Sequence, residues 1–154
     1  MATLPLTYKD RDSILREEAK SVDAAWLRSE AGQQLVEDMI ETMYHERGVG
    51  LAAPQIGESI RLIIVDPGHG RAEVIANPEL EILNEKEDVG EEGCLSIPGN
   101  WGRVPRAKKL RVTGLDRNGN DISFVVKGFH ARVYQHEVDH LNGTLIVDRF
   151  LSDD

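Results

Sequence analysis

The 154-residue sequence is poor in cysteine, and it has no long hydrophobic run. Its single cysteine, Cys94, excludes a disulfide within the chain. No apolar stretch approaches the roughly 18 residues that a membrane-spanning helix needs, so no membrane association is expected. The sequence also lacks internal repeats and low-complexity tracts, which excludes repeat architectures and argues for an ordinary globular fold.

Positive charge is also scarce. Lysine and arginine together number 18 against 27 aspartates and glutamates, which gives a formal net charge of −9 and a sequence pI near 5.0. Because a polyanion needs a basic surface, stable nucleic-acid binding is not expected. The first residues contain Asp10 and Asp12 and no apolar core, so they do not read as a secretory signal.

The remaining composition is typical of a globular domain, with 40% hydrophobic and 29% charged residues. A chain of this length buries roughly 70% of its unfolded surface, so it needs neither a disulfide nor a metal merely to fold. We therefore expect one domain that spans residues 1–154.

Two segments have the apolar spacing of helices. Residues 29–46 carry such a stripe, and Gly48 is a suitable stop. A second helix is expected from Gly128 to Gly143. Its expected inward stripe consists of Phe129, Val133, His136, His140 and Leu141.

Strand-like segments occupy the region between these helices. Residues 61–66 read as a buried strand, and residues 72–83 read as two short strands broken at Asn77-Pro78. The acidic residues 85–93 read as a solvated loop, and Asn118-Gly119 is a strong hairpin signal. Strands in one block, without regular β-α alternation, favour an α+β fold with antiparallel strands.

The stretch QHEVDH, residues 135–140, lies in the second expected helix. Residues four apart on a helix are separated by about 40° around the axis, so His136 and His140 point the same way and can hold one metal ion. Glu137 lies about 100° further round, where it can reach a metal-bound water. The alternative is an amphipathic helix that carries two histidines without a metal.

A catalytic site of this kind needs a third protein ligand and an open position for water. Two known protease patterns with the HExxH motif lack that ligand here. No glutamate follows His140, and Ile146 stands where a third histidine would be required. Upstream, the segment EGCLSIPG (92–99) offers Cys94, and one thiolate with two imidazoles is a chemically sensible set.

Three segments together resemble the signature motifs of the peptide deformylases: GVGLAAPQ (48–55), EGCLS (92–96) and QHEVDH (135–140). The resemblance covers nearly the whole chain. It implies an α+β fold in which antiparallel strands pack around a central helix that carries the HExxH motif. The site residues that it implies are Cys94, His136 and His140 as metal ligands, Glu137 as general base and acid, and the Gln55 side chain and the Leu95 N–H as stabilisers of the oxyanion.

The resemblance also implies the reaction, which is hydrolysis of the N-formyl group from formyl-methionyl N-termini of newly made polypeptides, with release of formate. The substrate would pair with the backbone near Val49 and Gly50, and its methionine side chain would lie near Arg132 and Val133, in a pocket widened at Gly90. Ligand softness suits Zn²⁺. The resemblance implies one divalent ion, with Fe²⁺ as the physiological metal and Zn²⁺ or Ni²⁺ as alternatives.

Two further side-chain roles have open alternatives. Glu92 and Arg106 are expected either to support the Cys94 loop as a pair or to form a plain surface salt bridge. Asp139 is expected either to orient a ligand imidazole or to face solvent.

The cellular setting also has alternatives. The chain ends on DRFLSDD without the basic extension of many bacterial deformylases, so only transient ribosome contact is expected. The expected compartment is the cytoplasm of a bacterial or phage-infected cell, or an organellar matrix or stroma if a transit peptide was removed.

Two other functions compete with deformylation. One is a metalloprotease with an unusual Cys/His/His site. The other is a protein with a purely structural metal site, which would need a fourth protein ligand.

Overall fold

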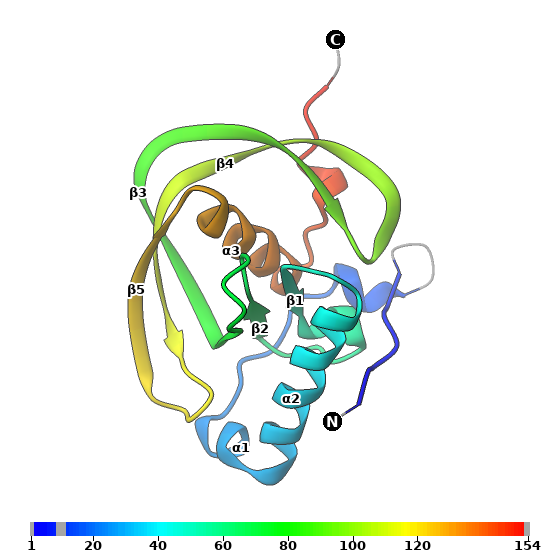
Figure 1. Ribbon diagram of the computed structural model, residues 1–154, viewed down its shortest axis with the longest axis vertical. Coiled ribbons are helices and arrows are strands. Elements are labelled where there is room, and N and C mark those ends of the chain that lie inside the picture. Colours follow the sequence, from blue (N-terminus) through cyan, green and yellow to red (C-terminus); the bar gives the residue numbers. More distant parts are fainter. Residues whose placement is uncertain (1, 9–11, 153–154) are drawn as a thin grey trace.

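A computed structural model of the chain describes residues 2–8 and 12–152 and shows an α+β fold (Figure 1). One antiparallel sheet has the strand order β1-β2-β3-β4-β5. The strands are β1 (Gly50–Ala52), β2 (Leu62–Val65), β3 (Glu73–Cys94), β4 (Ile97–Leu115) and β5 (Asp121–Lys127). The helices are α1 (Ala24–Arg28), α2 (Glu30–His45) and α3 (Gly128–Leu141), with short 3-10 helices η1 (Ser13–Arg16), η2 (Ala53–Ile56) and η3 (Ile146–Asp148).

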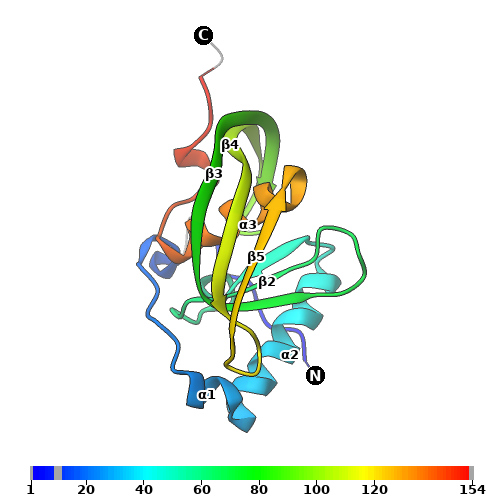
Figure 2. The same cartoon turned by 90° about the vertical axis from the view of Figure 1, so that its left-hand side faces the viewer.

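Helix α3 lies inside the curve formed by the long strands β3, β4 and β5, and α2 packs elsewhere on the sheet near β1 and β2 (Figures 1 and 2). The short strand β2 is buried along its whole length because it serves two cores. Ile63 and Val65 pack in the core around α3, whereas Leu62 and Ile64 pack in the core around α2. Alternation of side chains along a strand therefore lets one apolar run join both layers.

The two expected helices and the hairpin are confirmed. Helix α2 begins after Ser29, whose hydroxyl accepts a hydrogen bond from the N–H of Gly32, as an N-cap residue does. Helix α3 contains the whole stretch 135–140. Strands β4 and β5 are joined at Asn118-Gly119, and Gly119 adopts a φ of 79° there.

The prediction of two short strands followed by a solvated loop is wrong, because residues 73–94 form the single strand β3. The expected break is a bulge between Ala76 and Glu79, with Asn77 at a φ of 52°. The acidic part of β3 pairs with a basic part of β4, where Asp88 lies opposite Arg106. The acidic run is therefore largely exposed to solvent, as predicted, but its backbone is paired in a strand and does not form a loop.

The expected inward stripe of α3 is wrong at Phe129, which is 55% exposed. Val133 and Leu141 pack in the core as expected, together with Ala131, Tyr134 and Val138. A second, neighbouring face of α3 holds Glu137 and His140, which are also buried. Because two faces of one helix are buried against different partners, a single apolar stripe does not describe it. In residues 2–8 and 12–152, no helix is long and apolar enough to cross a membrane.

Gly57 and Gly143 both have a positive φ, but only Gly143 lies close to another part of the backbone, so comparing them tests that close approach. Gly143 has a φ of 74°, and a Cβ there would lie 2.6 Å from the backbone oxygen of Arg16. Gly57 has a φ of 86°, and a Cβ there would meet nothing within 4 Å. We expect Gly57→Ala to lower the free energy of unfolding by about 1–2 kcal/mol, the cost of a left-handed alanine. Gly143→Ala should lower the free energy of unfolding by about 1–3 kcal/mol more than Gly57→Ala does, because the added methyl group is also overpacked. Urea unfolding of both variants measures the difference. Equal losses in the two variants would contradict the close approach.

Candidate metal centre

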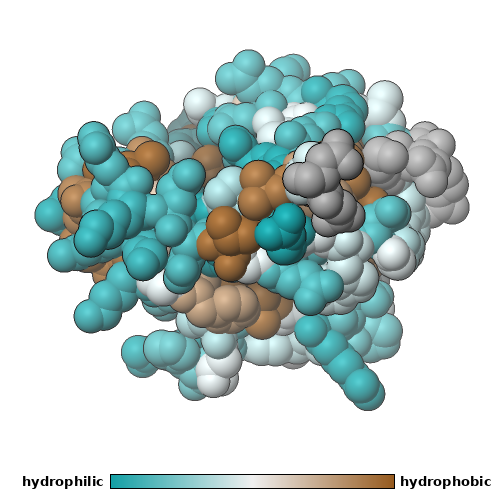
Figure 3. All heavy atoms as spheres, turned by 90° about the horizontal axis from the view of Figure 1, so that it is seen from above, coloured by the Kyte–Doolittle hydropathy of each residue, from teal (hydrophilic) through white to brown (hydrophobic). Residues whose placement is uncertain are grey.

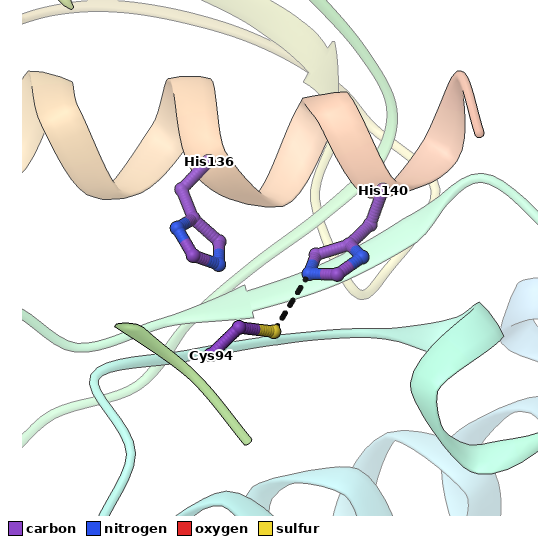
Figure 4. A group of neighbouring side chains, drawn as sticks. All are labelled: Cys94, His136 and His140. Atoms are coloured by element: carbon purple, nitrogen blue, oxygen red, sulfur yellow. Dashed lines mark hydrogen bonds between the residues drawn. The ribbon is translucent and has the colours of Figure 1, made fainter. Parts of the chain in front are cut away.

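Three potential metal ligands converge between β3 and α3 (Figure 4). Cys94 is the last residue of β3, and His136 and His140 project from α3 towards it. One ligand atom from each residue lies within 4.8 Å of the other two, and the Cys94 Sγ is 3.3 Å from the His140 Nε2. The structure therefore brings together the three residues that sequence analysis selected.

The donor set fits a divalent transition-metal ion. A soft thiolate and two imidazoles suit such ions, and all three side chains are at least half-buried. Burial holds the pKa of His140 well below its usual value, so its ring is neutral, as a ligand must be. Burial opposes protonation of His136 too, but its hydrogen bond with Cys94 and the charge of Glu137 raise its pKa to about 10. A bound cation would displace that proton.

Glu137 adjoins the three ligands and is 4% exposed. Its Oε1 is buried and has no hydrogen-bond partner among the described residues. Burial raises the pKa of this carboxyl to about 7, against the opposing charge of His136. A Cβ on Gly50 would lie 2.4 Å from the Glu137 Oε2, so the carboxylate occupies space that only a glycine leaves free.

The His136 ring is held from behind by Glu92. The His136 Nδ1 lies 2.9 Å from the Glu92 Oε1. Arg106 donates two hydrogen bonds to the same carboxylate, from Nε at 3.0 Å and from Nη2 at 2.9 Å. The Glu92 and Arg106 side chains are 6% and 3% exposed, so their pair supports the ligand loop and the surface salt-bridge alternative is wrong.

The charge of Glu92 is secured by these donors. Burial alone would raise the pKa of Glu92, but hydrogen bonds from His136 and Arg106 hold it well below its usual range. Arg132 adds a further hydrogen bond, from its Nη1 to the Glu92 Oε2 at 2.6 Å. An ionised, fully bonded carboxylate fixes which His136 nitrogen faces the cluster.

Asp139 makes no direct contact with an imidazole, and its side chain is only 13% exposed, so it neither bonds to a ligand ring nor faces solvent as predicted. Its Oδ2 accepts hydrogen bonds from the Arg106 Nη1 at 2.6 Å and from the Arg149 Nε at 2.6 Å. Its Oδ1 accepts a further bond from the Arg149 Nη2 at 2.9 Å. Arg149 was not among the predicted site residues, because its spacing from the motif matches no known ligand or support pattern.

Gln55 is 2% exposed and approaches the cluster from η2. Its Oε1 accepts a hydrogen bond from the Ala52 N–H at 3.0 Å, which fixes the orientation of the amide. The Nε2 therefore faces the site, where it lies 3.2 Å from the Ser96 Oγ and 3.5 Å from the Cys94 Sγ. Ser96 was also missed, although it lies inside the motif EGCLS.

A pocket of about 570 Å³ opens onto this group. The residues that it brings together include Val49, Gly50, Gln55, Cys94, Leu95, Arg132, Val133, His136 and Glu137, which are all the predicted site residues except His140. Phe129 and Trp101 also line the pocket and remain largely exposed. The Trp101 ring lies against Gly93, where a Cβ would come within 2.8 Å of its atoms. Figure 3 shows hydrophobic residues gathered on one face among hydrophilic ones.

Gly90 does not line the pocket, contrary to expectation. The Arg132 guanidinium covers it, since a Cβ at Gly90 would lie 3.0 Å from the Arg132 Cζ. Arg132 also donates to the backbone oxygens of Val104 at 2.9 Å and Asp88 at 2.7 Å. The charged end of Arg132 is therefore bound to the β3–β4 hairpin.

Comparisons with known proteins agree with one another. The sequence model of the polypeptide deformylase family matches residues 6–154. The peptide deformylase of Halothermothrix orenii is 48% identical over 139 residues, which cover 90% of this chain and 88% of that protein. Peptide deformylase 1 of Clostridium perfringens is 45% identical over 152 residues, which cover 98% of this chain and 100% of that protein.

Solved structures of peptide deformylases share the fold. The crystal structure from Thermotoga maritima has a TM-score of 0.92 at 39% identity and covers 99% of this chain and 100% of that chain. The K1U-bound class I type b enzyme from Acinetobacter baumannii has a TM-score of 0.93 at 42% identity and covers 97% of this chain and 100% of that chain. The resemblance first noted in three short motifs is thus confirmed along nearly the whole sequence, and this chain belongs to the peptide deformylase family of enzymes.

Proposed function

We propose that this chain is a metal-dependent hydrolase that removes the N-formyl group from formyl-methionyl N-termini of newly made polypeptides and releases formate. The observation that carries the proposal is the convergence of three ligand atoms within 4.8 Å beside the buried carboxylate of Glu137, whose Oε1 has no hydrogen-bond partner among the described residues. Residues 1–154 would act as one catalytic domain, in keeping with the match of whole solved deformylases to this chain.

Cys94, His136 and His140 would hold one divalent ion, with Fe²⁺ as the physiological metal and Zn²⁺ or Ni²⁺ as substitutes. When bound, such an ion supplies Lewis acidity, which lowers the pKa of a coordinated water from 15.7 to about 7. The group found among the described residues has three protein ligands rather than four. Three ligands favour a catalytic site over a structural one.

Glu137 would move the proton. Its buried Oε1 accepts a proton from the attacking water and then passes it to the nitrogen of the leaving amine as the C–N bond breaks. A carboxyl with a pKa near the working pH suits both transfers.

Two donors would stabilise the oxyanion that develops on the formyl oxygen. One is the Gln55 Nε2–H, whose direction is fixed by the hydrogen bond from Ala52 to the other end of the amide. The other is the backbone N–H of Leu95, in the two-residue turn between β3 and β4. Donors that are already oriented stabilise a transition state without reorganisation.

The peptide would lie along the edge strand β1, pairing with the backbone at Val49 and Gly50. Arg132 and Val133 precede His136 by four and three residues, so they line the same side of α3 one turn away. The first side chain of the substrate would rest on them. A solved deformylase from Acinetobacter baumannii, 41% identical, is described as bound to Met-Ala-Ser, which supports peptides that begin with methionine as ligands.

The partners would be formylated nascent chains, with at most transient ribosome contact. A net charge of −9 disfavours stable binding to nucleic acid. The relatives described above are bacterial, which favours the bacterial cytoplasm over an organelle. The metalloprotease alternative is not favoured, since those relatives are deformylases.

The test of the proposed function is formate release from formyl-Met-Ala-Ser by protein purified without oxygen. We expect formate, intact internal amide bonds and about one divalent ion per chain on metal analysis of the same sample. Chelation should abolish formate release, and Fe²⁺ or Ni²⁺ should restore it. Cleavage of an internal amide bond, or no formate from metal-loaded protein, would overturn the proposal.

Glu137→Gln should retain the metal and lower kcat about 10²- to 10⁴-fold, the usual contribution of a general acid-base group. Glu87→Gln changes an exposed carboxylate on β3 in the same way and should leave kcat unchanged. Metal analysis and steady-state kinetics on both variants check this. Turnover near the wild-type rate in Glu137→Gln would exclude the assigned proton transfer.

Gln55→Ala should lower kcat about 10²- to 10³-fold with little change in KM, because an oxyanion donor acts mainly in the transition state. Gln34→Ala removes an exposed amide from α2 and serves as the control. The measurement is kcat and KM with formyl-Met-Ala-Ser at equal metal content. A rise in KM alone would show that Gln55 binds the substrate rather than the oxyanion.

A further inference from the structure

A chain of ion pairs runs from the segment after α3 to the His136 imidazole. Arg149 binds both oxygens of Asp139, at 2.6 and 2.9 Å. Asp139 binds the Arg106 Nη1 at 2.6 Å. Arg106 binds both oxygens of Glu92, and the Glu92 Oε1 lies 2.9 Å from the His136 Nδ1. The charges alternate from Arg149 through Asp139 and Arg106 to Glu92.

The inner members of this chain are buried, whereas the outer one is not. The side chains of Glu92, Arg106 and Asp139 are 6%, 3% and 13% exposed. Arg149 is 46% exposed and follows η3, which packs in a small hydrophobic cluster with Leu15. The segment is tied down further by a backbone hydrogen bond from the Leu151 N–H to the Arg103 oxygen at 2.8 Å. Arg149 is therefore presented to Asp139 by an anchored backbone.

We propose that Arg149 is a positioning residue for the metal centre, which acts on His136 through Asp139, Arg106 and Glu92. The segment after α3 then forms part of the support of the site, although it supplies no ligand. The inference rests on the proposed role of His136 as a metal ligand.

The proposed coupling depends on the Arg106 guanidinium, which is shared between two carboxylates. This group serves two carboxylates at once, with two hydrogen bonds to Glu92 and one to Asp139. Arg149 neutralises Asp139, so Asp139 does not draw Arg106 away from Glu92. Without Arg149, the hold of Arg106 on Glu92 weakens, and the His136 ring is less firmly oriented. Looser orientation of a ligand ring lowers metal affinity.

A second ion pair in the same segment provides a matched control. Arg16 pairs with Asp148, the neighbour of Arg149, and the Arg16 side chain is 47% exposed. The Asp148 carboxylate accepts hydrogen bonds from the Arg16 side chain and from the backbone N–H of Leu145. Loss of Arg16 therefore removes an exposed ion pair of the C-terminal segment and breaks none of the hydrogen bonds that link Arg149 to His136, although the charge of Asp148 also acts on Arg149.

The experiment is the rate at which Zn²⁺-loaded full-length protein loses its metal to an excess of a coloured chelator. Arg149→Met should release Zn²⁺ about 3- to 30-fold faster than wild type, less than the upper range for direct partners of a ligand. Arg149→Lys keeps the charge but loses the bidentate hydrogen bond, so its Zn²⁺ release rate should lie between those of the wild type and Arg149→Met. Arg16→Met should match the wild type.

A double-variant cycle separates positioning from general stability. Once Asp139→Asn has removed the link, adding Arg149→Met should change the release rate by less than twofold. Rates that multiply in the double variant, or equal rates for Arg149→Met and Arg16→Met, would overturn the proposal. The readout needs no substrate, so it is independent of formate release. Failure of wild-type protein to release formate would instead count against the proposed function.

Discussion

The site depends on the hydrogen bonds that hold the buried carboxylate of Glu92. It comes from β3, and its donors come from β4 through Arg106 and from α3 through Arg132 and His136. Removing such a charge from water is costly unless every lone pair is used, and here each oxygen accepts two hydrogen bonds. Because Glu92 lies on β3 and its partners lie on β4 and α3, these hydrogen bonds also set the position of the helix against the sheet.

The shape of β3 brings a third potential ligand to the candidate metal centre. The strand runs for 22 residues and carries irregularities that bend it, so that it crosses the sheet and ends beside α3. Its last residue, Cys94, is thereby delivered to His136 and His140 (Figure 4). The arginine that covers Gly90 binds the same hairpin from the helix side.

Burial sets the properties of Glu137, the group proposed to transfer the proton. The carboxylate is enclosed, lacks a partner on one oxygen and has a pKa raised to about 7. Gly50 leaves room for it, and the amide of Gln55 is turned towards the cluster by Ala52. The site is therefore preorganised by groups that are themselves held by backbone contacts.

The sequence by itself determined the fold class, the two longer helices, the hairpin at Asn118-Gly119 and the family, because these follow from local periodicity, turn chemistry and short motifs. Only the tertiary structure decided that residues 73–94 are one strand, that Phe129 faces outward and that Asp139 binds arginines. Strand pairing and ion pairing depend on residues far apart in the sequence, such as Arg149 for Asp139 and Arg106 for Glu92. No local pattern carries that information, since the partner of a charge is set by which elements pack together.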